Sequence, residues 1–275
     1  MASPVTKRCP IAANARVMAK ASQVAMIARN AAMTQTFVDT IPMLPFGMLN
    51  AFLVVQGRRA MLVDTGLPNA APKVEKALHA RGLDWSDLAL TVLTHAHIDH
   101  AGSAVAVRRL SSAPLLAHAE DIPLCQGQAP VLRPSGPFGR LFQKTGAIQQ
   151  KFDYFSPDRI IQGADMDLSD YGFSARVLHT PGHTAGSVSV LLEDGRVIAG
   201  DLAASGILLG GIALRDRPKS PPFEEDIAGV IASLEHLLAR GCRQFFLGHG
   251  GPLPAQAIAH HVTNLRKSTV RARAA

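Results

Sequence analysis

Residues 94–102 read Thr-His-Ala-His-Ile-Asp-His-Ala-Gly, and this stretch decides the fold. It directly follows an apolar run at 88–93 that is typical of a buried strand. Four potential metal ligands fall within six residues: His95, His97, Asp99 and His100. Two imidazoles two positions apart in an extended turn can face one side, while the next Asp–His pair faces another. One short loop can therefore serve two metal ions.

Three further candidate ligands lie far along the chain. His183, Asp201 and His249 each follow a stretch whose apolar pattern predicts a buried strand. Strands of one sheet can end at a common edge, so this edge could collect all seven side chains. Imidazole and carboxylate ligands without thiolate suit Zn²⁺, with Mn²⁺ or Fe²⁺ as alternatives. The pattern therefore predicts a metal centre.

Five motifs occur in a fixed order: LVDTG (62–66), THAHIDHAG (94–102), HTPGHTAGS (179–187), AGD (199–201) and GHGG (248–251). In their order and spacing the sequence resembles the metallo-β-lactamase-fold hydrolase superfamily, in its lactonase and glyoxalase-II-like branch. The resemblance covers roughly residues 37–265. It implies an α/β fold, a four-layer αββα sandwich with the metals at one edge of the paired sheets.

The resemblance also implies the role of each ligand. The first metal would be held by His95, His97 and His183, and the second by Asp99, His100 and His249, with Asp201 bridging the two. Asp64 would orient the histidine loop.

This centre predicts a dinuclear-zinc-dependent hydrolase in which a metal-bound hydroxide attacks the carbonyl of a lactone or carboxylic ester. Asp99 and Asp201 are the expected catalytic carboxylates, Asp99 by relaying a proton and Asp201 by bridging the metals. Two cations, two carboxylates and a hydroxide leave the site near +1. The expected substrate is therefore a small molecule, neutral or anionic, with an apolar part.

Several alternatives stay open. Thioester or β-lactam hydrolysis would use the same site, and a mono-iron persulfide dioxygenase would use fewer metals. Zinc β-lactamases put cysteine or serine where this chain has Asp201, and acyl-homoserine lactonases put tyrosine where it has Ala204. Residues 203–214 also offer no basic side chain of the kind that binds glutathione in the glyoxalase-type thioesterases. A non-catalytic relative that uses the cleft only for binding is a third class.

The alternation of strands and helices predicts one hydrolase domain at 37–275, preceded by an N-terminal extension at 1–36. A hairpin is expected at 51–64, and helices at 70–81, 223–240 and 254–267. Residues 127–158, rich in Pro, Gly and Phe, predict an irregular insertion. Long loops of this kind are more often functional lids than simple connections.

Composition excludes several classes of protein. The 275 residues are 47% hydrophobic and 18% charged, and no apolar stretch approaches the roughly 20 residues of a membrane-spanning helix. The two basic ends carry +5 and +4 of the net +7, which leaves −2 on residues 33–265 and argues against a nucleic-acid partner.

Three widely spaced cysteines favour a reducing compartment, so we expect a cytoplasmic protein without membrane association. The acid-free residues 1–32 resemble a transit peptide, although an N-terminal helix packed on the domain, or an upstream extension with the functional start near Met33, fits them better. A homodimer is compatible with the sequence.

Overall fold

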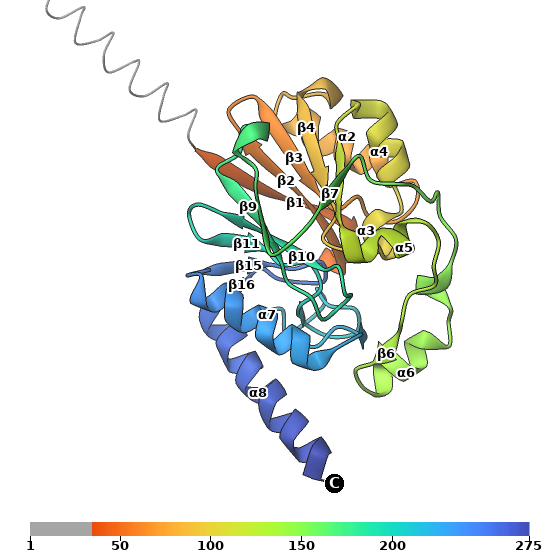
Figure 1. Ribbon diagram of the computed structural model, residues 1–275, viewed down its shortest axis with the longest axis vertical. Coiled ribbons are helices and arrows are strands. Elements are labelled where there is room, and N and C mark those ends of the chain that lie inside the picture. The colour runs from red at the N-terminus through yellow and green to blue at the C-terminus, as the bar shows by residue number, and fades with distance from the viewer. Residues whose placement is uncertain (1–34, 275) are drawn as a thin grey trace, which may run out of the picture.

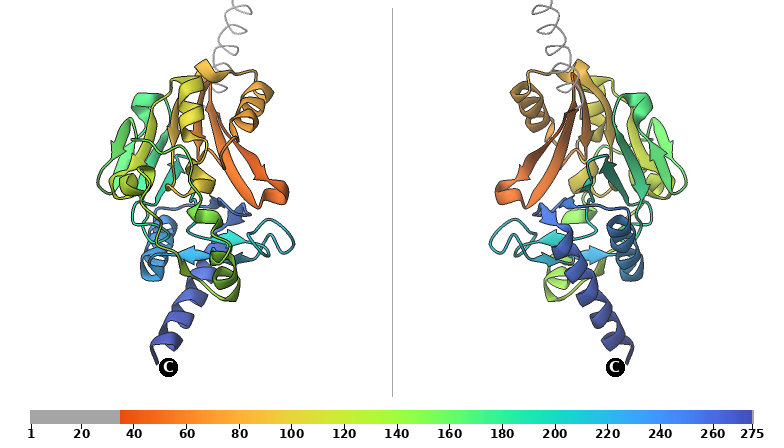
Figure 2. Two further views of the ribbon diagram at one scale, coloured as in Figure 1. Left: turned by 90° about the vertical axis from the view of Figure 1, so that its right-hand side faces the viewer. Right: turned by 90° about the vertical axis from the view of Figure 1, so that its left-hand side faces the viewer.

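Side chains on both faces of the longest inner strand are buried. In β2 (Leu49–Gln56), Phe52 and Val54 face the second sheet, whereas Leu53 and Val55 belong to the cluster beneath the helices. Such a strand needs cover on both sides, which a helix–sheet–sheet–helix arrangement supplies. The computed structural model describes residues 35–274 and has this four-layer αββα architecture (Figures 1 and 2). The predicted fold class is confirmed.

Two six-stranded mixed sheets form the inner layers. The first has the order β1 (Thr36–Leu44), β2, β3 (Arg59–Val63), β4 (Leu88–Val92), β5 (Leu115–His118) and β7 (Arg159–Ile161). The second has the order β16 (Leu253–Pro254), β15 (Gln244–Phe246), β11 (Arg196–Ile198), β10 (Val188–Leu192), β9 (Ala175–His179) and β8 (Asp165–Asp167). The rings of Phe52 and Phe246 meet edge to face between the sheets, with centroids 5.7 Å apart.

Helices cover the outer face of each sheet. The first sheet packs on α2 (Ala71–Ala80) and α4 (Ala104–Ser111), through side chains such as Val74 and Val107. The second packs on α7 (Ile227–Ala239) and α8 (Ala255–Ala274), and the far end of α8 extends away from the sandwich (Figure 1). No helix between residues 35 and 274 is both long and apolar enough to cross a bilayer.

Sequence patterns located most elements but not all of their ends. The predicted hairpin is β2–β3, and α2 ends just before Gly82, as expected. The helix predicted from residue 223 begins only at Ile227, because the Asp226 side chain accepts from the Ala228 amide (2.9 Å) and caps it there. The strand β1 was not predicted, and it begins at Thr36, inside the predicted extension. Residues 1–34 lie outside the described part of the chain.

The insertion at 127–158 contains short elements: β6 (Arg133–Pro134), α6 (Pro137–Gln143) and a 3-10 turn at Ala147–Gln149. Two-residue β6 pairs with β14 (Phe223–Glu224), which lies just before α7. The insertion therefore returns to the body of the protein beside the loop that leads into α7.

Removing the cap of α7 tests the account of this helix end. We expect Asp226→Ala to lower the free energy of unfolding by about 1 kcal/mol, because the first turn loses its side-chain acceptor. Asp226→Asn retains an acceptor and should stay within a few tenths of a kcal/mol of the parent. Urea unfolding followed by circular dichroism measures both, and equal stability of the two variants would contradict the cap.

Candidate metal centre

All seven predicted ligands lie together where four strands end. His95 and His97 follow β4, and the next turn is α3 (Ile98–Ala101), which carries Asp99 and His100. From the second sheet, His183 follows β9, Asp201 follows β11 and His249 follows β15. Residues about 155 positions apart in the sequence thus meet at one edge of the sandwich.

The ligand atoms fall into overlapping groups. In each of three sets, the nitrogen and oxygen atoms lie within 4.8 Å of one another: His95, His97 and His183; His95, His100 and Asp201; and Asp99, His100 and His249. The Asp201 carboxylate lies 3.7 Å from His183 Nε2, 3.5 Å from His100 Nε2 and 3.1 Å from His249 Nε2. It therefore contacts both histidine groups, as a bridging ligand would.

Several polar atoms of this cluster are buried without a hydrogen-bond partner. They include His95 Nε2, Asp99 Oδ1, His100 Nε2 and Asp201 Oδ1, while in the first group His97 Nδ1 and His183 Nε2 face each other at 3.2 Å. Buried polar atoms are normally paired, so orphan atoms aimed at a common centre need an explanation. Divalent cations that accept imidazole and carboxylate ligands supply the missing partners, and the residues present fit such a pair of ions.

Hydrogen bonds from outside the cluster orient three of the imidazoles. His100 Nδ1 contacts Asp64 Oδ2 at 2.9 Å, His95 Nδ1 contacts Thr94 Oγ1 at 3.1 Å, and His249 Nδ1 donates to the Met48 carbonyl. Each contact leaves Nε2 directed at the centre. The expectation that Asp64 orients the histidine loop matches its contacts, since Asp64 also accepts from the Thr94 amide at 2.7 Å.

Sequence reasoning missed a second buried carboxylate, Asp121, which is 1% exposed. Its Oδ2 accepts from the Ala96 amide (2.9 Å) and the Thr184 hydroxyl (3.1 Å), and its Oδ1 accepts from the Gly186 amide (2.9 Å). It thus ties the loop of His95 and His97 to the turn of His183. A Cβ on Gly186 would lie 2.5 Å from Asp121 Oδ1, so this approach requires glycine.

The two groups differ in protonation. Burial lowers the pKa of His95 well below its usual value and that of His97 to about 3. Burial acts in the same direction on His249, but the carboxylates of Asp201 and Asp99 outweigh it and raise its pKa to about 10. The same carboxylates, with Asp64, raise the pKa of His100. At neutral pH the first group therefore presents neutral imidazoles, while His100 and His249 hold protons that a cation must displace.

A cavity of about 240 Å³ opens over this centre. Its polar lining consists of His97, Asp99, His183, Asp201 and His249. Its other lining residues are apolar: Leu44, Leu49, Leu67, Ile98, Phe142, Ala147, Ile148, Leu209, Pro222 and Phe223. The cavity therefore has a polar floor and hydrocarbon walls.

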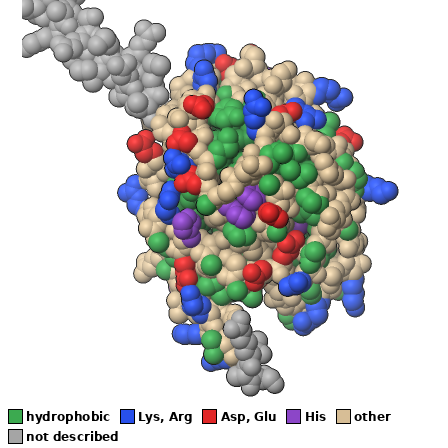
Figure 3. Space-filling view, viewed as in Figure 1, with side chains coloured by type: hydrophobic (Ala, Val, Ile, Leu, Met, Phe, Trp, Pro, Cys, Tyr) green, Lys and Arg blue, Asp and Glu red, His purple; other side chains and the backbone are tan. Residues whose placement is uncertain are grey.

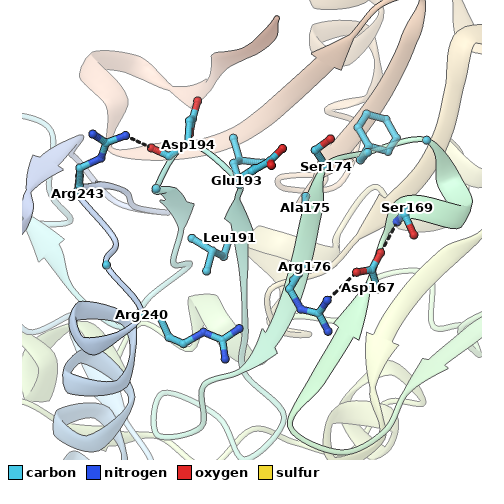
Figure 4. A pocket seen from close by; sticks show the side chains of 15 residues that line it. Asp167, Ser169, Ser174, Ala175, Arg176, Leu191, Glu193, Asp194, Arg240 and Arg243 are labelled. Carbon is cyan, nitrogen blue, oxygen red and sulfur yellow. Dashed lines mark hydrogen bonds and ion pairs between the residues drawn. The ribbon is translucent and has the colours of Figure 1, made fainter. Parts of the chain in front are cut away.

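A larger cavity, of about 620 Å³, lies at the opposite ends of β9 and β10 (Figure 4). Its lining includes no histidine or cysteine, and Arg176 there pairs with Asp165 and Asp167 at 2.8 and 2.6 Å. None of the seven predicted ligands is among its lining residues, so this cavity offers no comparable chemistry.

Comparison with known proteins places the chain in a family. The family model described as the metallo-beta-lactamase superfamily matches residues 44–249. The chain is 24% identical to the probable metallo-hydrolase YflN of Bacillus subtilis over 216 residues (74% of this chain, 80% of YflN). It is also 24% identical to the hydroxyacylglutathione hydrolase GloC of Haemophilus influenzae over 203 residues (72% and 84%).

Solved structures agree on the fold. The BLEG-1 B3 metallo-beta-lactamase matches with a TM-score of 0.61 and 22% identity, covering 83% of this chain and 99% of that one. TTHA1623, solved in a di-iron-bound form, matches with a TM-score of 0.56 and 26% identity (81% and 96%). The chain belongs to the metallo-β-lactamase superfamily. Within that superfamily, its buried histidine-rich metal site makes it a metal-dependent hydrolase.

Asp121 provides a test of how the first group is held. We expect Asp121→Asn to weaken metal binding by the group His95, His97 and His183 about 10- to 100-fold, because an amide cannot accept all three hydrogen bonds. The second group should keep its affinity. Competition with a chelator measures the affinity for each of the two metal ions. The control is Asp153→Asn, which makes the same change at an exposed aspartate. Equal weakening of both equivalents, or of neither, would refute this role.

The raised pKa values of His100 and His249 predict a pH dependence. Both protonated forms compete with a cation, so metal affinity of the second group should rise with pH between about 6.5 and 8.5. The first group, whose imidazoles are already neutral, should change little over that range. Calorimetry in buffers of different ionisation enthalpy counts the protons released when each metal ion binds. If neither ion releases protons, His100 and His249 are not protonated before the metal binds.

Proposed function

We propose that this protein is a dinuclear zinc hydrolase that cleaves a lactone or carboxylic ester with an apolar part. The observation that carries the proposal is the position of the Asp201 carboxylate, within 3.7 Å of histidines from both groups. His95, His97 and His183 would hold one ion, Asp99, His100 and His249 the other, and Asp201 both. When bound, such ions supply hydroxide at neutral pH and polarise a carbonyl.

Asp99 is suited to move the proton. Burial would raise its pKa, but His100 and His249 outweigh this effect and lower the pKa to about 2, so the carboxylate is ionised at neutral pH. Its Oδ1 has no partner, and the residue lines the cavity above the cluster. A carboxylate so placed can accept a proton from the nucleophile at Oδ1 and pass it to the leaving oxygen.

The surroundings favour a small, largely apolar substrate over a polyanion. Lys and Arg side chains are scattered around the rim of the face in Figure 3 and do not gather into one patch there. No Lys or Arg is among the residues that line the cavity at the centre. A nucleic-acid substrate, or a thioester carrying a charged peptide tail like that of glutathione, would find no Lys or Arg side chain in this cavity.

A hydrolysis screen with metal analysis tests the proposal. The metal-loaded protein is assayed on lactones, aryl esters, thioesters, β-lactams and phosphodiesters, before and after EDTA treatment and Zn²⁺ or Mn²⁺ addition. We expect about two zinc ions per chain and turnover of lactones or esters that EDTA abolishes. About two iron ions per chain, with the same hydrolysis, would assign iron in place of zinc, the metal found in the di-iron-bound form of TTHA1623. About one iron, with oxygen uptake on a persulfide, would overturn hydrolysis.

Removing the shared ligand gives the sharpest single change. Asp201→Ala should lower kcat/KM by on the order of a thousandfold and reduce metal content, because both ions lose a ligand. Asp216→Ala, which changes an exposed aspartate in the following loop, is the matched control. Full activity and full metal content in Asp201→Ala would rule out the bridging role.

A further inference from the structure

Part of the cavity wall comes from a segment that contributes none of the seven predicted metal ligands. Phe142, Ala147 and Ile148 all belong to the insertion at 127–158, and Phe223 belongs to the strand that pairs with it. All seven predicted ligands lie outside the insertion. This separation lets the insertion determine what the site accepts without altering the ligands.

The insertion is held in place over the centre by close backbone packing. A Cβ on Gly139 would lie 2.2 Å from the Pro222 carbonyl oxygen, so α6 approaches this segment as closely as a glycine allows. The Ser135 amide also donates to the Pro222 carbonyl at 2.9 Å. The 3-10 turn at Ala147–Gln149 contacts α3, the helix of Asp99 and His100. The segment is therefore anchored both before Phe142 and at the turn that contains Ala147 and Ile148.

Aromatic stacking places Phe142 at the cavity. Its ring stacks on Phe138, with centroids 5.9 Å apart, and on Phe223, with centroids 5.7 Å apart. Phe142 and Ile148 are each half-buried, whereas their neighbour Leu141 is 66% exposed and does not line the cavity. Lys219, the cation over Phe138, donates to the Leu208 carbonyl and does not line the cavity either.

We propose that the insertion forms part of a subsite for an uncharged hydrocarbon chain of the substrate, in which Phe142 and Ile148 set the chain length accepted. The inference rests on the proposed function, because the chain must belong to the ester or lactone held at the metal centre. At about 30 Å³ for a water-sized group, a cavity of about 240 Å³ holds roughly eight such groups. A chain of about six to eight carbons fills it.

A series of p-nitrophenyl esters from acetate to dodecanoate tests the subsite on the metal-loaded full chain. Each CH₂ that enters the cavity should raise kcat/KM by about fourfold, and the rise should stop near eight carbons. A flat dependence on chain length would overturn the subsite.

A charge placed in the wall gives a selective variant. Ile148→Asp should lower kcat/KM for the octanoate ester at least tenfold and for the acetate ester less than twofold. Leu141→Asp is the matched control, because it adds the same charge to an exposed neighbour and should change neither value. Phe142→Ala should lengthen the best chain, since it enlarges the cavity. Equal effects of Ile148→Asp on both esters would overturn the subsite.

Direct binding separates failure of the subsite from failure of the proposed function. Octanamide and acetamide are titrated calorimetrically into the parent protein and Ile148→Asp, with metal content checked in both. Tighter binding of octanamide that Ile148→Asp removes would support the subsite even if no ester were hydrolysed. Equal binding of the two amides by the parent, with esters hydrolysed, would refute the subsite and leave the proposed function standing.

Discussion

Burying several imidazoles and carboxylates within a few ångströms of one another is the constraint on which the rest of this structure depends. Asp201 is 5% exposed and His100 is fully buried, yet atoms of both lack partners within the protein. Such a cluster is unfavourable in a protein interior unless its charges compensate one another or bind cations. The strands supply the rigidity that holds these groups together, because their ends cannot move apart without disrupting the sandwich.

Two further carboxylates extend this rigidity, one for each group. Asp64 holds the His100 ring and the Thr94 amide, while Asp121 joins the His95–His97 loop to the His183 turn. Neither belongs to the clusters that could hold a metal. Close backbone approach completes the arrangement, since a Cβ on Gly248 would lie 2.2 Å from Asp201 Oδ1. The geometry of the ligands is thus set before any metal arrives, which lowers the entropy lost on binding.

Much of this centre could be predicted from the sequence because its ligands follow recognisable strands. The cluster at 94–102 is contiguous, and His183, Asp201 and His249 come directly after apolar runs, so one edge of a sheet was the natural meeting place. Asp121 gave no comparable signal, because its partners are backbone amides of distant loops. The β1 strand was missed because its pattern is broken: most of its side chains are only half-buried at the edge of the sheet. Its pairing with β2 is a tertiary property.

The position that the insertion takes in the cavity wall could not be predicted from the sequence, for a related reason. The Pro, Gly and Phe content of 127–158 indicated an irregular segment, but the pairing of β6 with β14 and the contact of Gly139 with Pro222 decide where it lies. The floor of the cavity comes from strand ends fixed by the fold, whereas part of its wall comes from an insertion anchored by a few contacts. Substitutions in the insertion can therefore change which molecule enters while the ligands stay in place. This division separates the residues placed to bind metal from some of those placed to contact a substrate, so the fold and the metal site do not by themselves determine the substrate.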